Sequence, residues 1–125
     1  MKRVPFEMEF LFRASPSMLY KFLTTPSCLI RWFCERVEIV NGKYTFYWGS
    51  AEEVAHLLED IEDERVRFVW EDGNPDEFLE FRFAKADITD DTVLEIHDFC
   101  DANDRHNQQQ LWTTQMEALR HAIGG

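Results

Sequence analysis

The sequence predicts an α+β fold in which a strongly curved antiparallel sheet of six or seven strands grips one long C-terminal helix. Apolar residues alternate with polar ones in short segments separated by turn residues, which is typical of consecutive antiparallel strands. Two helix-start signals follow the first segment, and helical spacing of apolar residues returns only near the C-terminus. Because 125 residues, 45% of them hydrophobic, can bury a substantial core, we expect a single domain over residues 1–125.

The first strand is predicted at residues 6–12, where every second residue is Phe or Met. Ser15 then caps a short helix, and Pro16 occupies its first turn, where the missing N–H costs no hydrogen bond. Thr25 and Pro26 repeat this signal, so we expect a second short helix rather than an extension of the first. The second helix is expected to contain Leu29, Ile30, Trp32 and Phe33.

A β-hairpin is predicted at residues 37–48. Its turn is Asn41-Gly42, because both residue types readily adopt the positive φ that a tight hairpin turn requires. The second strand of this hairpin places three aromatic residues on one face: Tyr44, Phe46 and Trp48. Gly49 and Ser50 then mark a break or a bulge.

Four more strands and a final helix are expected in the rest of the chain. The strands are residues 52–61, 65–70, 77–88 and 92–100. The first of them has a composition that also suits a helix, but Val54, His56 and Leu58 alternate, which favours a strand. Three residues are candidate caps of the last helix: Asp101, Asn103 and Asp104. Its apolar face is predicted to consist of Leu111, Trp112, Gln115, Met116, Leu119 and Ile123.

The chain is strongly acidic, with a formal net charge of −11. Nucleic acids and anionic membrane surfaces recruit Lys and Arg, so this balance argues against both as partners. We expect the acidic turns to favour solubility and to keep strand edges apart. The alternative is that the acidic loop at residues 71–77 docks a basic partner.

Other features of the sequence predict a cytoplasmic location. No apolar run approaches the roughly 20 residues that span a bilayer. The N-terminal segment lacks the apolar region of a signal peptide, because Glu7 and Glu9 interrupt it. Cysteine occurs only at positions 28, 34 and 100, a sparse and odd set that fits a reducing compartment better than a disulfide framework.

The order strand, two helices, six strands, helix resembles the START-like superfamily, also called helix-grip or SRPBCC. Within it, the chain is most similar to bacterial homologues of the activator of the heat-shock chaperone ATPase. The motifs that carry the likeness are Ser15-Pro16, Thr25-Pro26 with Leu29 and Trp32-Phe33, the hairpin 41–46, the strand 65–70 and Leu111-Trp112. The resemblance implies a pocket between the curved sheet and the last helix, and it does not imply one particular activity.

Large aromatic rings are the main candidates for a binding site. If the sheet cups the last helix, several rings must face inward, and Tyr and Trp can orient a mostly apolar ligand through their polar tips. The alternative for each ring is plain core packing. The candidate ligand-binding residues are Trp32, Phe33, Tyr44, Phe46, Trp48, Phe68, Trp70, His97, Phe99 and Trp112.

His97 is expected to share a face with Phe99 and to point into the cavity, whereas Asp98 points outward. Because neighbouring strand residues lie on opposite faces, they cannot form a catalytic dyad, and no Ser or Cys completes a nucleophile set. We therefore predict no catalytic residues. The run 97–106 is rich in potential metal ligands, but its spacing matches no common zinc pattern, so neither a metal nor a cofactor is expected.

Arg67 and Arg82 are expected to form cross-strand pairs with Glu80 or Glu95 on the outer face of the sheet. The alternative is that either arginine binds the carboxylate of a ligand.

The leading hypothesis is a non-catalytic binding module for a small apolar or amphipathic ligand held between the sheet and the last helix. The first alternative is a protein-interaction module resembling chaperone-ATPase activators, which rests on fold likeness alone. The second is a pocket enzyme of the cyclase or hydrolase type. The sequence leaves the oligomeric state, the identity of the ligand and the protein partner open.

Overall fold

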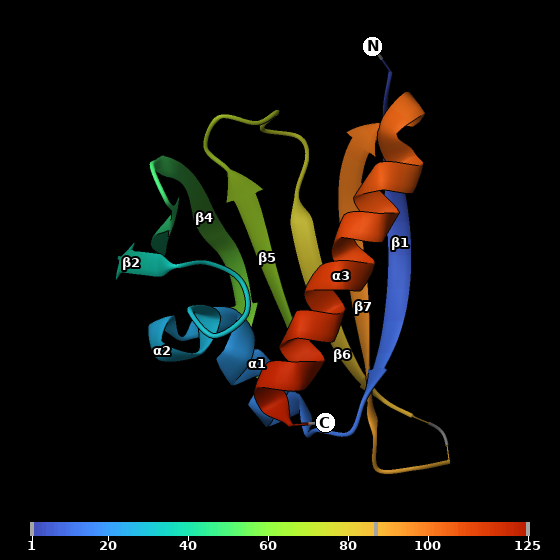
Figure 1. Cartoon of the computed structure of the whole chain (residues 1–125). Helices are drawn as coiled ribbons and strands as arrows, with labels where there is room; N and C mark the ends of the chain where they lie inside the picture. Colours follow the sequence, from blue (N-terminus) through green and yellow to red (C-terminus); the bar gives the residue numbers. More distant parts are fainter. Residues whose placement is uncertain (1, 87, 125) are drawn as a thin grey trace.

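The computed structural model describes residues 2–86 and 88–124 and confirms the predicted α+β architecture (Figure 1). Seven antiparallel strands form one sheet in the order β1-β7-β6-β5-β4-β3-β2. The strands are β1 (Arg3–Phe12), β2 (Arg36–Val40), β3 (Lys43–Trp48), β4 (Ala51–Ile61), β5 (Arg65–Trp70), β6 (Leu79–Lys85) and β7 (Thr92–Asp101). The helices are α1 (Pro16–Thr24), α2 (Pro26–Leu29), the 3-10 turn η1 (Ala102–Asp104) and α3 (Arg105–Ile123).

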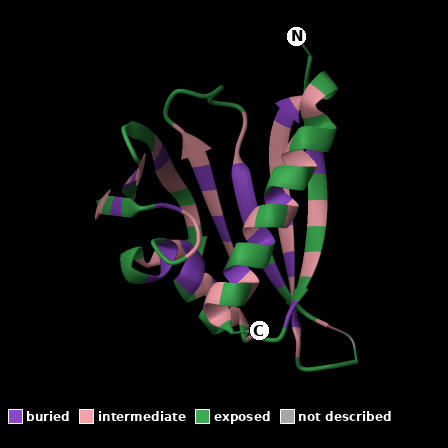
Figure 2. Cartoon of the chain, in the orientation of Figure 1, coloured by how far each residue is buried: buried purple, intermediate pink, exposed green. Residues whose placement is uncertain are grey.

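The long helix α3 crosses one face of the sheet over β6, β7 and β1, and α1 and α2 lie near its C-terminal end (Figure 1). Burial follows this arrangement, because the buried hydrophobic residues of the strands form one core cluster with those of α3, α1 and α2, and Figure 2 shows buried positions on the strands and on all three helices. On α3, Trp112, Met116 and Leu119 are buried, whereas Leu111 remains 49% exposed. The predicted apolar face is therefore confirmed for these three residues, and Ile123 also packs against the core, whereas Leu111 and Gln115 lie at its edge, where they line a cleft.

The local signals at the start of the chain act as predicted. Ser15 Oγ accepts a hydrogen bond from the backbone N–H of Met18 at 3.1 Å and caps α1. Asn41 and Gly42 form the hairpin turn with φ of 50° and 80°, which confirms the expected turn geometry.

The second helix is shorter than predicted. It ends at Leu29, and Trp32 and Phe33 lie in the turns that follow rather than inside the helix. The backbone N–H groups of Phe33 and Cys34 both donate to the carbonyl of Leu29, and the N–H of Glu35 already donates to Tyr47 of β3. The helix stops because the chain has to enter the sheet within a few residues.

Strand β4 confirms the predicted strand and adds a feature that was not foreseen. The register between β4 and β5 shifts between Leu57 and Glu59, which marks a β-bulge. Ala55 is buried and faces the core, whereas Leu58 is 62% exposed. The alternation that predicted this strand therefore describes its outer face.

Strand β6 runs only from Leu79 to Lys85, shorter than the predicted 77–88, of which residue 87 lies outside the described residues. Both ends of β6 are set by its pairing with the neighbouring strands β5 and β7. The last pairs with β5 and β7 are Phe68 with Leu79 and Lys85 with Thr92, so the chain beyond them has no strand to bind.

The outer face of the sheet carries a row of charges across five strands. Residues in register along this row are Glu7, His97, Glu80, Arg67 and Glu59. Glu80 is only 2% exposed. Its Oε1 lies 2.7 Å from Arg67 Nη2, and its Oε2 lies 2.6 Å from Arg82 Nε. The predicted outer-face pairing of both arginines is confirmed, with Glu80 as the shared partner.

Candidate ligand-binding cleft

A cleft opens between the sheet and α3, on the side of β4 and β5. It has two lobes, with volumes of about 580 and 310 Å³, and both are lined by Glu53, Trp70, Asp98 and Gln108. The larger, which we call the loop lobe, extends to Asn74, Phe78 and Phe99 beside the loop 71–78. The smaller, which we call the helix lobe, reaches Phe33, Trp48, Leu111 and Trp112. Because the lobes share four lining residues, we treat them as one cleft.

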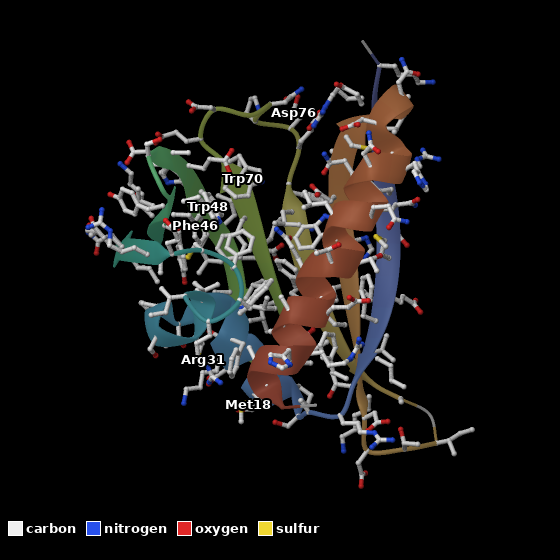
Figure 3. All side chains as sticks on the ribbon, in the orientation of Figure 1. Met18, Arg31, Phe46, Trp48, Trp70 and Asp76 are labelled. Carbon is white, nitrogen blue, oxygen red and sulfur yellow. The ribbon has the colours of Figure 1, made fainter. Side chains whose placement is uncertain are left out.

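Trp70 lies at the centre of this cleft. It is the last residue of β5, immediately before the loop 71–78, and its ring is only partly buried. Figure 3 shows its side chain near those of Trp48 and Phe46, over strands β4 and β5. The ring centroids of Trp70 and Phe46 are 6.0 Å apart, so the core supports one side of the indole. Of the four tryptophans, Trp70 is the one whose Nε1 has no hydrogen-bond partner within residues 2–86 and 88–124.

The polar groups of three other aromatic side chains form hydrogen bonds within the protein. Trp48 Nε1 donates to the carbonyl of Phe33 at 2.7 Å, and Trp32 Nε1 donates to that of Phe22 at 2.9 Å. The hydroxyl of Tyr44 donates to the carbonyl of Thr24 at 3.0 Å, and burial raises its pKa to about 12. These bonds fix the rings of the wall, so the expectation that their tips orient a ligand does not fit these three residues.

Beneath the cleft the interior is nearly solid. A third void, lined among others by Trp32, Phe46 and Phe68, measures only about 20 Å³. That is room for about one water molecule. Phe33 packs edge-on against both Phe46 and Trp48, with centroids 5.0 and 5.4 Å apart, and closes this end. A ligand would therefore lie in the open cleft and not in a buried apolar chamber.

Asp98 faces the cleft, which corrects the predicted orientation. Its Oδ2 accepts a hydrogen bond from Trp112 Nε1 at 2.9 Å, and its Oδ1 accepts one from the N–H of Phe99 at 2.8 Å. Burial raises the pKa of Asp98 above its usual value, although these hydrogen bonds oppose the shift. The inward face of β7 contains Leu94, Ile96 and Cys100, all buried. The alternation of Leu94, Ile96 and Cys100 places residue 98 on the same inward face. Sequence reasoning missed this signal.

His97 lies on the outer face and not in the cavity as predicted, because it alternates with Asp98 along β7. Its Nδ1 is 3.1 Å from Glu7 Oε1. Phe99 is also on the outer side, where its ring packs edge-on against Phe78 at 5.4 Å and borders the loop lobe.

The structure thus places the ten candidate residues at four locations. Those that line the two lobes are Phe33, Trp48, Trp70, Phe99 and Trp112. Those that line only the small void are Trp32, Phe46 and Phe68. Tyr44 is in the core and His97 is on the outer face.

Sequence reasoning did not identify the polar residues of the cleft. Glu53 lies opposite Phe46 in the β3–β4 pairing, and it therefore faces inward. No hydrogen bond or ion pair reaches its carboxylate from the part of the chain that the structure describes. The sequence did contain a signal for this position. A hairpin at Gly49-Ser50 pairs β3 with β4 and places Glu53 opposite the inward-facing ring of Phe46.

Arg3 builds the outer wall of the loop lobe. Its Nη2 lies 2.6 Å from Glu77 Oε1, and its Nη1 lies 3.3 Å from Asp101 Oδ1. The hydrogen bond from Arg3 lowers the pKa of Glu77, against the opposing effect of burial. The guanidinium thereby ties the loop 71–78 to the adjacent ends of β1 and β7.

Comparison with known proteins identifies the family to which this fold belongs. The family model of the START-like superfamily domain matches residues 1–125. The chain belongs to the START-like superfamily. A comparison with curated protein sequences finds no match.

Solved structures support the START-like fold. A protein from Bacteroides fragilis, solved by NMR in solution, is 28% identical, with a TM-score of 0.72 over 97% of this chain and 91% of that one. The Aha1 dimer from Colwellia psychrerythraea is 16% identical, with a TM-score of 0.82 and 96% of both chains covered. CalU16 from Micromonospora echinospora is 20% identical, with a TM-score of 0.72 over 95% of this chain and 75% of that one. The likeness to the last two shows the fold alone.

Two further observations concern the described residues. No three or more His, Cys, Asp or Glu side chains among them are grouped as they would be around a metal ion. No helix in residues 2–86 and 88–124 has the length and apolar character needed to cross a membrane.

Proposed function

We propose that this START-like chain is a non-catalytic binding module for a small amphipathic molecule, held in the cleft between the sheet and α3. The observation that carries the proposal is the size and lining of the cleft. Its lobes, of about 580 and 310 Å³, fall in the range of small-molecule pockets, roughly 300–1,000 Å³. One wall is aromatic and the other is polar, so an amphipathic ligand fits better than a wholly apolar one.

The lining supports binding rather than catalysis. Within the described residues, the two lobes contain no His, Ser, Thr, Tyr or Lys. Cys100 borders the loop lobe, but burial raises the pKa of its thiol, which disfavours the nucleophilic thiolate. Asp98 would be the acid of a pocket enzyme, but it has no partner base or nucleophile there. An enzymatic role is therefore the less favoured alternative.

The experiment is native mass spectrometry of the protein purified from cells, combined with a thermal-shift screen of small amphipathic molecules. We expect a bound molecule or a stabilising compound. Trp70→Ala should remove the effect, whereas Leu58→Ala, a control on the outer face, should retain it. A protein with no bound molecule and no stabilising compound would contradict the proposal.

A second candidate function is a protein-interaction module that uses the acidic loop 71–78. Two of the loop's carboxylates are engaged, because Glu71 lies 3.1 Å from His56 Nε2 and Glu77 binds Arg3. Asp72 and Asp76 remain for a basic partner, and Figure 3 shows Asp76 on the loop above Trp70. This function predicts a partner in pull-downs that is lost with Asp72→Asn and Asp76→Asn but retained with Trp70→Ala.

We also propose a cytoplasmic location. Cys28, Cys34 and Cys100 are free and buried, which is consistent with a reducing compartment. Fractionation of the producing cells would test this.

A further inference from the structure

The cleft carries an uneven charge. Among the described residues, five carboxylates line its two lobes (Glu53, Glu77, Asp98, Asp101 and Asp104), against one guanidinium, that of Arg3. Arg3 is already bonded to Glu77 and Asp101. One positive charge offsets only part of five carboxylates, so the lining of the cleft keeps a negative formal charge.

Within the described residues, no cationic side chain forms a hydrogen bond or an ion pair with the two carboxylates at the centre, and Arg3 acts on Asp98 only through space. Asp98 receives hydrogen bonds only from the neutral donors Trp112 Nε1 and Phe99 N–H. Glu53 receives none within residues 2–86 and 88–124. These two residues are on β7 and β4, and both border both lobes.

The partly buried indole of Trp70 lies between them. The strand order β7-β6-β5-β4 places Trp70 of β5 between the strands that carry Asp98 and Glu53. The ring borders both lobes, and Phe46 supports it from the core. An indole face flanked by carboxylates attracts an organic cation through cation–π and Coulomb interactions together.

The rest of the cleft fits an organic cation better than a metal ion. The carboxylates do not converge in the described residues as metal ligands do. The helix lobe beside them is bordered by Phe33, Trp48 and Leu111, which would contact hydrocarbon. A bulky ammonium group with an apolar tail therefore matches both parts of the cleft.

We propose that the ligand is an organic ammonium compound, with its charged nitrogen against Trp70, between the carboxylates of Glu53 and Asp98, and its apolar portion against Phe33, Trp48 and Leu111. This inference rests on the proposed function, and it adds the chemical class of the ligand. It predicts that positive charge, and not only apolar surface, determines which molecules bind.

The test compares two probes of the same shape by isothermal titration calorimetry and tryptophan fluorescence. Benzyltrimethylammonium carries the charge, and neopentylbenzene is its neutral isostere. We expect the cation to bind at least fivefold more tightly, and Trp70→Leu to weaken it about fivefold by removing the indole.

The matched charge variants are Glu53→Gln and Glu52→Gln. Glu53 faces the cleft, whereas Glu52 is its neighbour on the opposite face of β4, opposite Tyr47. We expect Glu53→Gln to weaken the cation about fivefold, Glu52→Gln to have less than a twofold effect, and both variants to keep the melting temperature of the parent.

The outcomes separate this inference from the proposed function. Equal binding of the two probes, with no effect of Glu53→Gln, would overturn the ammonium ligand but leave a binding cleft. Failure of both probes, in a protein that also carries no bound molecule and shows no thermal shift, would overturn both proposals.

Discussion

Replacing Glu80 with Gln should be the most destabilising loss of a single charge on the outer face of the sheet. Glu80 is 2% exposed and accepts hydrogen bonds from Arg67 Nε at 2.9 Å and Arg82 Nε at 2.6 Å. A Gln side chain keeps one acceptor oxygen but turns an NH₂ group toward one guanidinium. The substitution thus removes one charge-assisted hydrogen bond and the attraction to both arginines.

A hydrogen bond to a charged group contributes about 1.5–3 kcal/mol, and a broken buried pair costs about 3–5 kcal/mol. The side chains of Arg67 and Arg82 are 31% and 44% exposed, so water can solvate them after the change. We therefore expect Glu80→Gln to lower the free energy of unfolding by about 2–3 kcal/mol.

The matched control is Glu38→Gln. Glu38 lies 3.9 Å from Arg36, and both side chains are more than half exposed, at 58% and 65%. Such a surface pair contributes about 0.5 kcal/mol or less. Urea denaturation of the two variants and the parent measures the difference. If Glu80→Gln is within about 0.5 kcal/mol of the control, the argument from the buried carboxylate fails.

The pH dependence gives a second readout of the same residue. Burial alone would raise the pKa of Glu80, but hydrogen bonds from Arg82 and Arg67 outweigh it and hold the pKa below its usual value. A lowered folded-state pKa means that the stabilisation is present above the unfolded-state value, about 4.5, and is lost as the pH falls through the folded-state value. The stability gap between the parent and Glu80→Gln should therefore narrow below about pH 4.5.

Three further changes test other parts of the structure. Arg3→Met should speed backbone hydrogen exchange in the loop 71–78 and cost about 1 kcal/mol of stability, because Glu77 of the loop loses its bonds to the Arg3 guanidinium; unchanged exchange would contradict this. Leu119→Ala, at a fully buried site of α3, should cost about 2–5 kcal/mol in urea denaturation; a loss below about 1 kcal/mol would contradict tight packing there. Burial raises the pKa of Cys34 to about 11, so an alkylating reagent at pH 8 should modify this thiol only in urea, and rapid labelling of the folded protein would count against its burial.

The features that the sequence predicted correctly are those with a local physical cause. Ser15 and Pro16 begin α1 because their backbone preferences act within one helical turn. Asn41 and Gly42 form the hairpin turn because both tolerate positive φ. The alternation of Phe and Met in β1 specifies an inward face wherever that strand pairs. Element types, their order and the curved sheet with its helix follow from such signals.

The errors concern features that depend on distant partners. Asp98 and His97 are on the faces opposite to those predicted, because the apolar alternation of β7 outweighs the aromatic character of Phe99. The end of α2 depends on pairing with β3, and the bulge in β4 depends on β5. Glu53 enters the cleft only through the register between β3 and β4. Register and the lateral position of α3 decide the lining of the cleft, and neither is visible in a single segment.

The pairing of β1 with β7 also determines when the sheet can be completed. Arg3 and Asp101, which are neighbours in the folded protein, are 98 residues apart in the chain. During synthesis β1 therefore emerges early and stays without its strand partner until almost all the other elements have been made. Its row of Phe and Met is exposed in this interval, and such rows promote aggregation. Glu7 and Glu9 interrupt the row and keep the unpaired strand charged, a pattern that opposes aggregation.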